Sequence, residues 1–378
     1  MAQPKNYGFE EEAGMLKDGA RRFFTEKLPV DQLHALVADA YVPERAPEVK
    51  WRKELWDEMV ALGWTSLAVP ESAGGVGMPW VAVAGLLEEN GRAAFPSPLM
   101  ATLQATAVLT QCGPAGEPAL AEIAEGAAAT IAVMDDAGGA TPGAVQLVDG
   151  KLNGTACFVQ DACKCDHLLV VALEADKPAF FWVKLDAEGV NVRSDAIIDL
   201  TRDQARVSFD AVSAQRIDTD AAAAWESALP IVWMLISADM VGASEWLLQT
   251  TVEYAQQRKQ FDRSLGFFQA VKHDLVNVMI AIDESKSLLY SAACAIDHEP
   301  ERARELSHMA KSSASDTAAL ASGRTVQMHG GIGFTWECYV HLYFKRQKHS
   351  QLLWGDASWH RAALAALLMD RPTVEAAA

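Results

Sequence analysis

The chain has 378 residues, half of them hydrophobic and 22% charged, a composition typical of a globular protein with more than one core-forming unit. Its formal net charge of −18 argues against nucleic acid as a partner, because phosphate backbones select positive surfaces. The N-terminal stretch MAQPKNYGFEEEAG lacks the apolar segment of a signal peptide, and no apolar run approaches the roughly 20 residues of a membrane-spanning helix. We therefore expect a cytoplasmic protein without membrane insertion.

The six cysteines show neither zinc-ligand spacing nor the spacing of a CxxC redox pair. Two of them, Cys163 and Cys165, are separated by one residue, as expected for small thiols on one face of a strand. We expect all six to be reduced and no metal to be bound.

The predicted elements fall into three segments. Residues 1 to 124 are predicted to be helical, with a loop at SLAVPESAGGVGMPW (66–80), where two prolines and several glycines prevent regular structure. Residues 125 to 220 are predicted to form short strands separated by turns such as Asp149-Gly150 and Asn153-Gly154. Strands at this spacing are typical of a small barrel or sandwich.

Residues 221 to 378 are predicted to be helical again. Apolar residues spaced four, three and four apart from Val271 to Ile282 indicate one buried helix face. Breaks at RKQFDRSLGFF (258–268) and HGGIGF (329–334) delimit four helices, as in an antiparallel bundle. The glycines of the second break cost about 1 kcal/mol each in a helix, so this segment is either a plain turn or a place where a ligand approaches the backbone.

This order and five motifs resemble the acyl-CoA dehydrogenase family over nearly the whole chain. In chain order, the motifs are LGWTSLAVPESAGGVG, LEENGRAAFPSP, LNGTACFVQDACKCDHLLVVA, YAQQRKQFDRSLGFFQAVKH and QMHGGIGFTWE. The resemblance implies an α+β multidomain fold with an N-terminal helical domain (1–124), a central β-barrel domain (125–220) and a C-terminal four-helix bundle (221–378). It also implies FAD as cofactor, an acyl-CoA thioester as substrate and electron-transfer flavoprotein as acceptor.

The resemblance assigns two segments to the adenosine and pyrophosphate end of an FAD that is bound mainly by a neighbouring subunit. The residues at the matching positions are Arg258, Phe261, Gln269, Gln327, Gly330 and Gly331. A guanidinium can donate two hydrogen bonds to phosphate oxygens, and bare backbone lets N–H groups approach them closely. The alternatives are a surface ion pair of Arg258 with Glu253 or Asp262, and a plain turn at the glycines.

The part of the family pattern that contacts the isoalloxazine ring is altered. Phe158 and Gln160 match positions at which typical members have Trp and Thr, and VMDDAGGATPG (133–143) replaces a Thr-Glu-Pro stretch. We therefore expect this chain's own ring site to depart from the family pattern.

The catalytic base of the family has no counterpart at the expected positions. Removal of the α-proton needs a carboxylate in an apolar site. The family supplies it either just before a glycine near the C-terminus, where this chain has Trp354, or about nine residues before a Val-Gly pair, where it has Val232. The nearby carboxylates, none of which combines the right position and face, are Glu226, which we expect to precede the helix, Asp239 and Asp356.

HGGIGFTWE (329–337), followed by HLYFKRQKHSQLLWGDASWHR (341–361), resembles the heterotetrameric branch of the family in bacterial steroid side-chain degradation, in which one chain carries the base and the other completes the FAD site. We predict that it is the subunit without the base, and that its partner is a related chain or a second copy of itself. The alternatives are a flavoprotein of the same fold but another class, either flavin monooxygenase-like or associated with nucleic acid, and a self-sufficient dehydrogenase with an unusual base.

Overall fold

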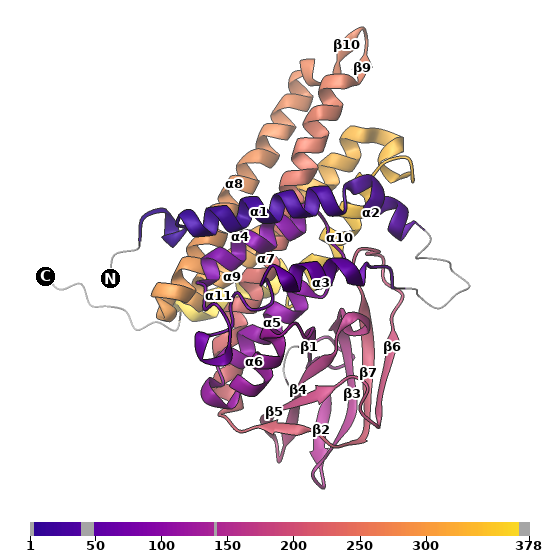
Figure 1. Cartoon of the computed structure of the whole chain (residues 1–378). Coiled ribbons are helices and arrows are strands. Elements are labelled where there is room, and N and C mark those ends of the chain that lie inside the picture. The colour runs from indigo at the N-terminus through magenta and orange to yellow at the C-terminus, as the bar shows by residue number, and fades with distance from the viewer. Residues whose placement is uncertain (1–3, 39–48, 140–141, 370–378) are drawn as a thin grey trace, which may run out of the picture.

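The structure is a computed structural model that describes residues 4–38, 49–139 and 142–369. Figure 1 shows short N-terminal helices across the middle of the molecule, a sheet below them, and long C-terminal helices that rise above both. The predicted fold class, with its order of helices, strands and helical bundle, is confirmed.

The N-terminal unit is built from helices that pack on the bundle as well as on each other. They are α1 (Glu11–Lys27), α2 (Val30–Val37), α3 (Lys53–Ala61), α4 (Trp80–Arg92), α5 (Leu99–Thr110) and α6 (Glu117–Ala124), with short 3₁₀ turns η1 (Lys5–Gly8), η2 (Glu71–Ala73) and η3 (Gly113–Ala115). Residues 99–109 of α5 are all buried, and most of them are apolar, so the helix has no side that faces solvent. α5 therefore lies inside the protein, where it can line a site between the units.

The central unit is one eight-stranded sheet. Its strands are β1 (Ala129–Ala132), β2 (Val145–Val148), β3 (Lys151–Gln160), β4 (His167–Glu174), β5 (Lys177–Lys184), β6 (Val190–Ser194), β7 (Gln204–Val212) and β8 (Gln215–Ile217), with a 3₁₀ turn η4 (Ala162–Lys164). They follow the order β6-β7-β3-β2-β4-β5-β8, and β1 pairs in parallel with β4. Among the described strands β6 and β8 do not pair with each other, so hydrogen bonds do not close the sheet into a complete barrel. One sheet face has its own apolar core, separate from the main core.

Of the two predicted turns, one is confirmed and one is wrong. Asp149 and Gly150 connect β2 to β3 with φ of 50° and 74°, the left-handed pair that a tight type I′ turn requires. Asn153 and Gly154, in contrast, lie inside β3, where the pairing with β7 shifts register. A Cβ at Gly154 would lie 2.3 Å from the Ala144 oxygen, so this glycine allows a close strand contact and does not form a turn.

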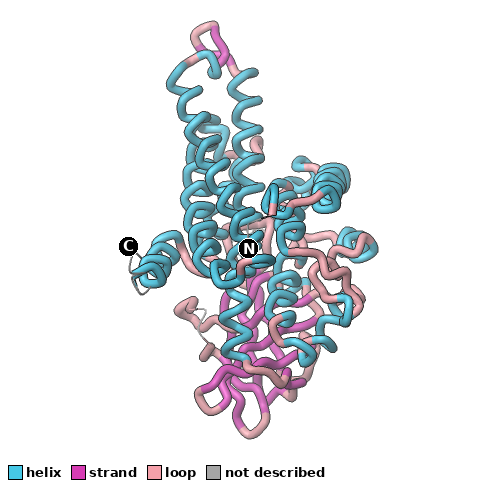
Figure 2. Tube along the Cα trace, turned by 90° about the vertical axis from the view of Figure 1, so that its left-hand side faces the viewer, coloured by secondary structure: helices cyan, strands magenta, loops and turns pink. Residues whose placement is uncertain are grey.

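The C-terminal unit contains α7 (Ala221–Gln257), α8 (Gln269–His298), α9 (Pro300–His329), α10 (Val340–Leu352) and α11 (Ala357–Met369). A hairpin of β9 (Lys259–Gln260) and β10 (Arg263–Ser264) and the turns η5 (Leu265–Phe267) and η6 (Gly330–Phe334) lie between them. The described part thus has one helix more than predicted, because the chain also breaks at residues 353–356. Figure 2 shows the hairpin at the free tip of the long helices.

The 37-residue helix α7 spans about 55 Å at 1.5 Å per residue and runs through the whole molecule. It is the one described helix that is long and apolar enough to cross a membrane, but 94% of its most apolar window is buried inside the protein. Its apolar side chains therefore pack in the core of the protein.

Two glycines let α4 and α7 cross with their backbones in contact. A Cβ at Gly91 would lie 2.0 Å from the Asp239 oxygen, and a Cβ at Gly242 would lie 1.7 Å from the Glu88 oxygen. Any side chain at either position would push the helices apart. The crossing joins the N-terminal unit to the bundle in one apolar core.

Candidate functional site

Trp354 and Val232 occupy the two positions at which a base was expected, and both are buried. Val232 lies on α7 and is fully buried. The Trp354 side chain packs against Trp225, and their ring centroids are 6.1 Å apart. Neither side chain can act as a proton acceptor. No carboxylate stands at either position, as expected from the sequence, and both side chains make apolar contacts.

The space expected for the flavin ring is closed. Phe158, Gln160 and Trp354 help to line a cavity of about 10 Å³, which is close to the room that one water molecule needs. Phe158 and Trp354 adopt left-handed backbone conformations, with φ of 56° and 59°, which cost roughly 1–2 kcal/mol each for such residues. An isoalloxazine of three fused rings does not fit into a cavity of this size.

Buried basic side chains hold the backbone of the loop that carries Trp354. His360 Nε2 donates to the Trp354 oxygen at 3.1 Å, so the Nδ1 of His360 accepts from His308 Nδ1 at 2.8 Å. Lys311 Nζ donates to the Gly355 oxygen at 2.9 Å. Burial is the main cause that lowers the pKa of Lys311 to about 7, of His308 to about 4 and of His360 to about 3. Both imidazoles are therefore neutral at pH 7.

A larger cavity of about 540 Å³ also borders Trp354. Its walls include four indole rings, those of Trp225, Trp233, Trp354 and Trp359. The guanidinium of Arg304 lies over the Trp233 ring, 5.6 Å from its centroid. The cavity thus combines flat apolar surfaces with a few charged groups at its wall, which suits a ring-bearing ligand.

Two of the three nearby carboxylates, Glu226 and Asp356, border the same cavity. The expectation that Glu226 precedes the helix is wrong, because α7 begins at Ala221 and Glu226 lies in its second turn. Its carboxylate pairs with Arg304 at 2.5 Å. Asp356 is exposed and accepts a hydrogen bond from the Trp359 N–H at 2.8 Å, which caps the start of α11. Each carboxylate therefore already has a structural partner.

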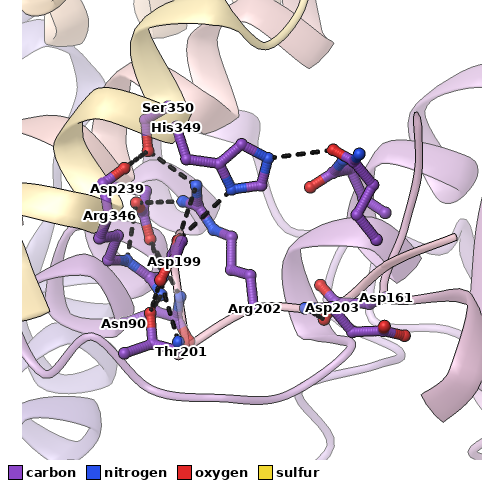
Figure 3. Close-up of polar contacts among 12 residues, drawn as sticks. Asn90, Asp161, Asp199, Thr201, Arg202, Asp203, Asp239, Arg346, His349 and Ser350 are labelled. Atoms are coloured by element: carbon purple, nitrogen blue, oxygen red, sulfur yellow. Dashed lines mark hydrogen bonds and ion pairs between the residues drawn. The ribbon is translucent and has the colours of Figure 1, made fainter. Parts of the chain in front are cut away.

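The third carboxylate, Asp239, belongs to a buried charge network between α7, α10 and the segment before β7 (Figure 3). Arg346 donates to it through Nε at 3.2 Å and Nη2 at 2.5 Å, Arg202 through Nη2 at 2.6 Å, and Asn90 through its amide at 3.3 Å. Burial alone would raise the pKa of Asp239, but the two guanidinium groups outweigh it and hold that pKa below its ordinary value. An ionised, fully bonded carboxylate is a poor general base, so we assign Asp239 a structural role.

A second carboxylate balances the network. Asp199 accepts from the backbone and hydroxyl of Thr201 at 2.9 and 2.7 Å, and from His349 Nδ1 at 3.4 Å. Burial would raise its pKa, but the hydrogen bond from His349 and the nearby Arg202 and Arg346 hold the pKa far below its usual range. Two buried arginines thus face two buried carboxylates, and the network fixes the β unit against the bundle.

The two segments expected to contact the phosphate end of FAD lie side by side at one end of the bundle. Tyr254, one turn before Arg258, and His329, directly before Gly330, stack with centroids 4.2 Å apart and planes 23° apart. Arg258 is exposed, and in the described ranges no ion pair joins it to Glu253 or Asp262. The structure therefore brings the two segments together and leaves the guanidinium accessible.

We use the term FAD arm for the six residues that the resemblance assigns to the cofactor. These are Arg258, Phe261, Gln269, Gln327, Gly330 and Gly331, and all six are exposed. The Phe261 side chain is 87% exposed, and a Cβ at Gly330 or Gly331 would meet nothing within 4 Å. Their donors and open backbone fit a phosphate group of another molecule. Their role in binding FAD stays a prediction.

Comparisons with known proteins bear on both halves of the molecule. Residues 10–122 match the family model described as acyl-CoA dehydrogenase, N-terminal domain, and residues 226–369 match that of the C-terminal domain. The chain is 31% identical to the acyl-CoA dehydrogenase IpdE2 of Mycobacterium tuberculosis (strain ATCC 25618 / H37Rv) over 292 residues, 77% of this chain and 79% of that protein. The chain belongs to the acyl-CoA dehydrogenase family.

Solved structures agree with this acyl-CoA dehydrogenase assignment. The structure titled "Tcur3481-Tcur3483 steroid ACAD G363A variant" superposes with a TM-score of 0.84 at 29% identity and covers 95% of this chain and 98% of its own. The ChsE4-ChsE5 complex from Mycobacterium tuberculosis superposes with a TM-score of 0.85 at 24% identity, covering 97% and 100%, and at that identity it supports the fold alone.

Sequence reasoning found the altered base and ring positions of this acyl-CoA dehydrogenase but missed the residues that support them. Lys311, His308 and His360 come together only through the packing of α9 against α11 and the preceding loop. Asp239 carried one usable signal: a single carboxylate inside the apolar run LPIVWMLISADMVG needs a buried cationic partner. The sequence did not show that Arg202 and Arg346 supply it.

Proposed function

We propose that this chain is a subunit of an FAD-dependent acyl-CoA dehydrogenase, that it does not carry the catalytic base, and that its FAD arm completes the flavin site of a partner chain. When bound in that site, FAD accepts the hydride from the β carbon of the acyl group. We call the cavity lined by Phe158, Gln160 and Trp354 the closed ring pocket. The observation that carries the proposal is that the volume of this pocket is only about 10 Å³.

The FAD arm supports the second half of the proposal. Arg258, Lys259 and Arg263 place three cations within six residues of a chain whose net charge is −18. A local positive charge with exposed donors favours the pyrophosphate of FAD. Along α7, Val232 and Arg258 are 26 positions apart, or about 39 Å at 1.5 Å per residue. Trp225, near the start of α7, packs against Trp354 of the ring pocket, so the arm and the pocket lie toward opposite ends of one helix, and the arm is placed to serve another subunit.

The similar proteins support the kind of assembly and the kind of substrate. Two of the similar structures have titles that name two chains, and one title names a steroid acyl-CoA dehydrogenase. We infer a heterotetramer with a related chain, a CoA thioester with a bulky ring-bearing acyl group as substrate, electron-transfer flavoprotein as acceptor and a cytoplasmic location. The indole-lined cavity is compatible with a flat ring system, but the reaction itself requires the base of the partner.

The test compares the chain expressed alone with the chain co-expressed with a related chain that has a glutamate before the corresponding glycine. We expect little flavin and little ferricenium-coupled acyl-CoA oxidation from the chain alone, and both from the complex. Flavin absorbance per chain and turnover are the measurements. Full flavin occupancy with robust turnover from the chain alone would show that the proposal is wrong.

A self-sufficient dehydrogenase with an unusual base remains the second candidate, because Glu226 and Asp356 both border the 540 Å³ cavity. Glu226→Gln and Asp356→Asn separate the two functions. Under our proposal, neither change alters turnover of the assembled enzyme by more than a few-fold, since the base lies in the partner. A loss of several orders of magnitude in kcat from either change would favour the self-sufficient enzyme.

A further inference from the structure

Three residues that line the closed ring pocket each have one buried polar atom without a hydrogen-bond partner in the described residues. They are Nε2 of Gln104, Oε1 of Gln160 and Nε1 of Trp354. The three residues are 2%, 5% and 6% exposed, and they come from α5, β3 and the loop before α11. Buried polar groups are nearly always paired, so three unpaired atoms around one cavity indicate a shared partner.

The hydrogen-bonding types of these atoms are set by their surroundings. Gln160 Nε2 donates to the Phe158 oxygen at 3.0 Å and to Gln204 Oε1 at 3.2 Å, so its Oε1 is left to accept. An indole N–H can only donate, and the unpaired atom of the Gln104 amide is its Nε2, which is also a donor. The cavity therefore offers two donors and one acceptor, which is the complement of one water molecule.

The size of the cavity excludes organic ligands. Its volume of about 10 Å³ is close to the lower limit for a single water molecule, and a buried water usually has two to four polar partners. We propose that one ordered water molecule occupies this cavity, accepts from Gln104 and Trp354, donates to Gln160, and thereby locks the ring pocket shut. The consequence of this inference is a pocket that cannot admit a flavin ring, and in that respect the inference rests on the proposed function.

The water explains how the closed arrangement persists although Phe158 and Trp354 hold left-handed conformations. On the backbone side, the Trp354 oxygen accepts from His360, and the Gly355 oxygen accepts from Lys311. On the side-chain side, the water would bond the indole N–H to residues of the N-terminal and β units. Trp354 is then held at both its backbone and its ring, and the water links all three units of the fold.

The direction in which one substitution shifts the unfolding temperature tests for the water. If Gln104 Nε2 donates to a bound water, Gln104→Met removes a satisfied hydrogen bond, and we expect the unfolding temperature to fall by about 2–4 °C. If the amide is truly unpaired, the same change removes a buried polar group without a partner, and the unfolding temperature stays the same or rises. Gln111→Met, at an exposed position just after α5, is the matched control and should change nothing.

A high-resolution crystal structure of the full chain, alone or in its complex, gives the second measurement. We expect density for one water within hydrogen-bond distance of all three atoms, and its loss in Gln104→Met. A closed pocket without water density, or an unfolding temperature that does not fall, would overturn the water but leave the proposed function intact. Flavin density in the pocket would overturn both.

Discussion

Replacement of Asp239 by asparagine tests whether the buried charge network holds the units together. The asparagine keeps the shape of the side chain but removes its charge, and its amide group would face the guanidinium groups of Arg202 and Arg346. Both guanidinium groups are buried, and the carboxylate that remains, Asp199, is 3.9 Å from Arg202. The variant therefore leaves two buried cations with one buried anion.

The expected loss of stability follows from that imbalance. Removal of one partner of a buried ion pair costs roughly 3–5 kcal/mol. At about 2–4 °C per kcal/mol, the scale for domains of 150–250 residues, the unfolding temperature should fall by roughly 6–20 °C. Asp316→Asn is the matched control, because Asp316 pairs with Arg361 at 2.6 Å with both side chains at least half exposed. An exposed pair contributes at most about 1 kcal/mol, so the control should shift by only a few degrees.

The assay is thermal unfolding of both variants over a range of pH. Because the pKa of Asp239 lies below its ordinary value in the folded chain, its contribution is present above about pH 4 and is lost as the pH falls toward the folded pKa. Asp239→Asn should therefore lose part of the acid sensitivity of the wild type. An Asp239→Asn chain that unfolds within 2 °C of the wild type would refute the reasoning.

Three further changes test the FAD arm, the buried lysine and the base position. Arg258→Ala should weaken FAD binding to the assembled enzyme by roughly 30- to 150-fold, from the loss of a charged two-point contact worth about 2–3 kcal/mol, with unchanged helicity. A flavin titration checks this against Lys177→Ala, an exposed lysine on β5 outside the FAD arm, as control, and an unchanged affinity in Arg258→Ala would contradict it. Since burial lowers the pKa of Lys311 to about 7, the unfolded chain binds more protons than the folded one between pH 7 and about 10.4, so stability should rise with pH there. Lys311→Met should lack that rise in urea unfolding, and a variant that kept it would exclude Lys311 as the source. Trp354→Glu should unfold at lower temperature and gain no acyl-CoA oxidation, because it buries an unpaired charge while Phe158 and Gln160 still depart from the family's flavin-ring contacts. A stable variant with turnover would mean that the site lacked only its base.

Local signals in the sequence were enough to predict the order of the units. Proline and glycine mark where helices end, and the Asp149-Gly150 pair forms the turn that its residue types favour. Asn153-Gly154 has similar composition but lies within β3, because the shift in pairing between β3 and β7 depends on a strand more than fifty residues away. Local composition cannot distinguish a turn from such a bulge.

The candidate site was predictable to the extent that it departs from the family pattern. Trp354, Val232 and Phe158 stand at family positions, so their altered chemistry could be read directly from the sequence. The network of Asp239 and Arg346 could not, because its members are 107 residues apart and meet only after α7 and α10 pack. Nothing in the sequence spacing identifies such a contact.

The length of α7 has a consequence for how far changes at one end of the molecule affect the other. Near the start of this helix Trp225 packs against Trp354 of the closed pocket, and the FAD arm follows its other end, with a backbone crossing at Gly91 and Gly242 between them. A mutation that destroys chemistry at the first end leaves the geometry of the second unchanged, since nearly 40 Å of continuous helix separates them. Under the proposed function, a few substitutions at one end of α7 can therefore remove catalysis without a change in the surface that the other end offers to a partner.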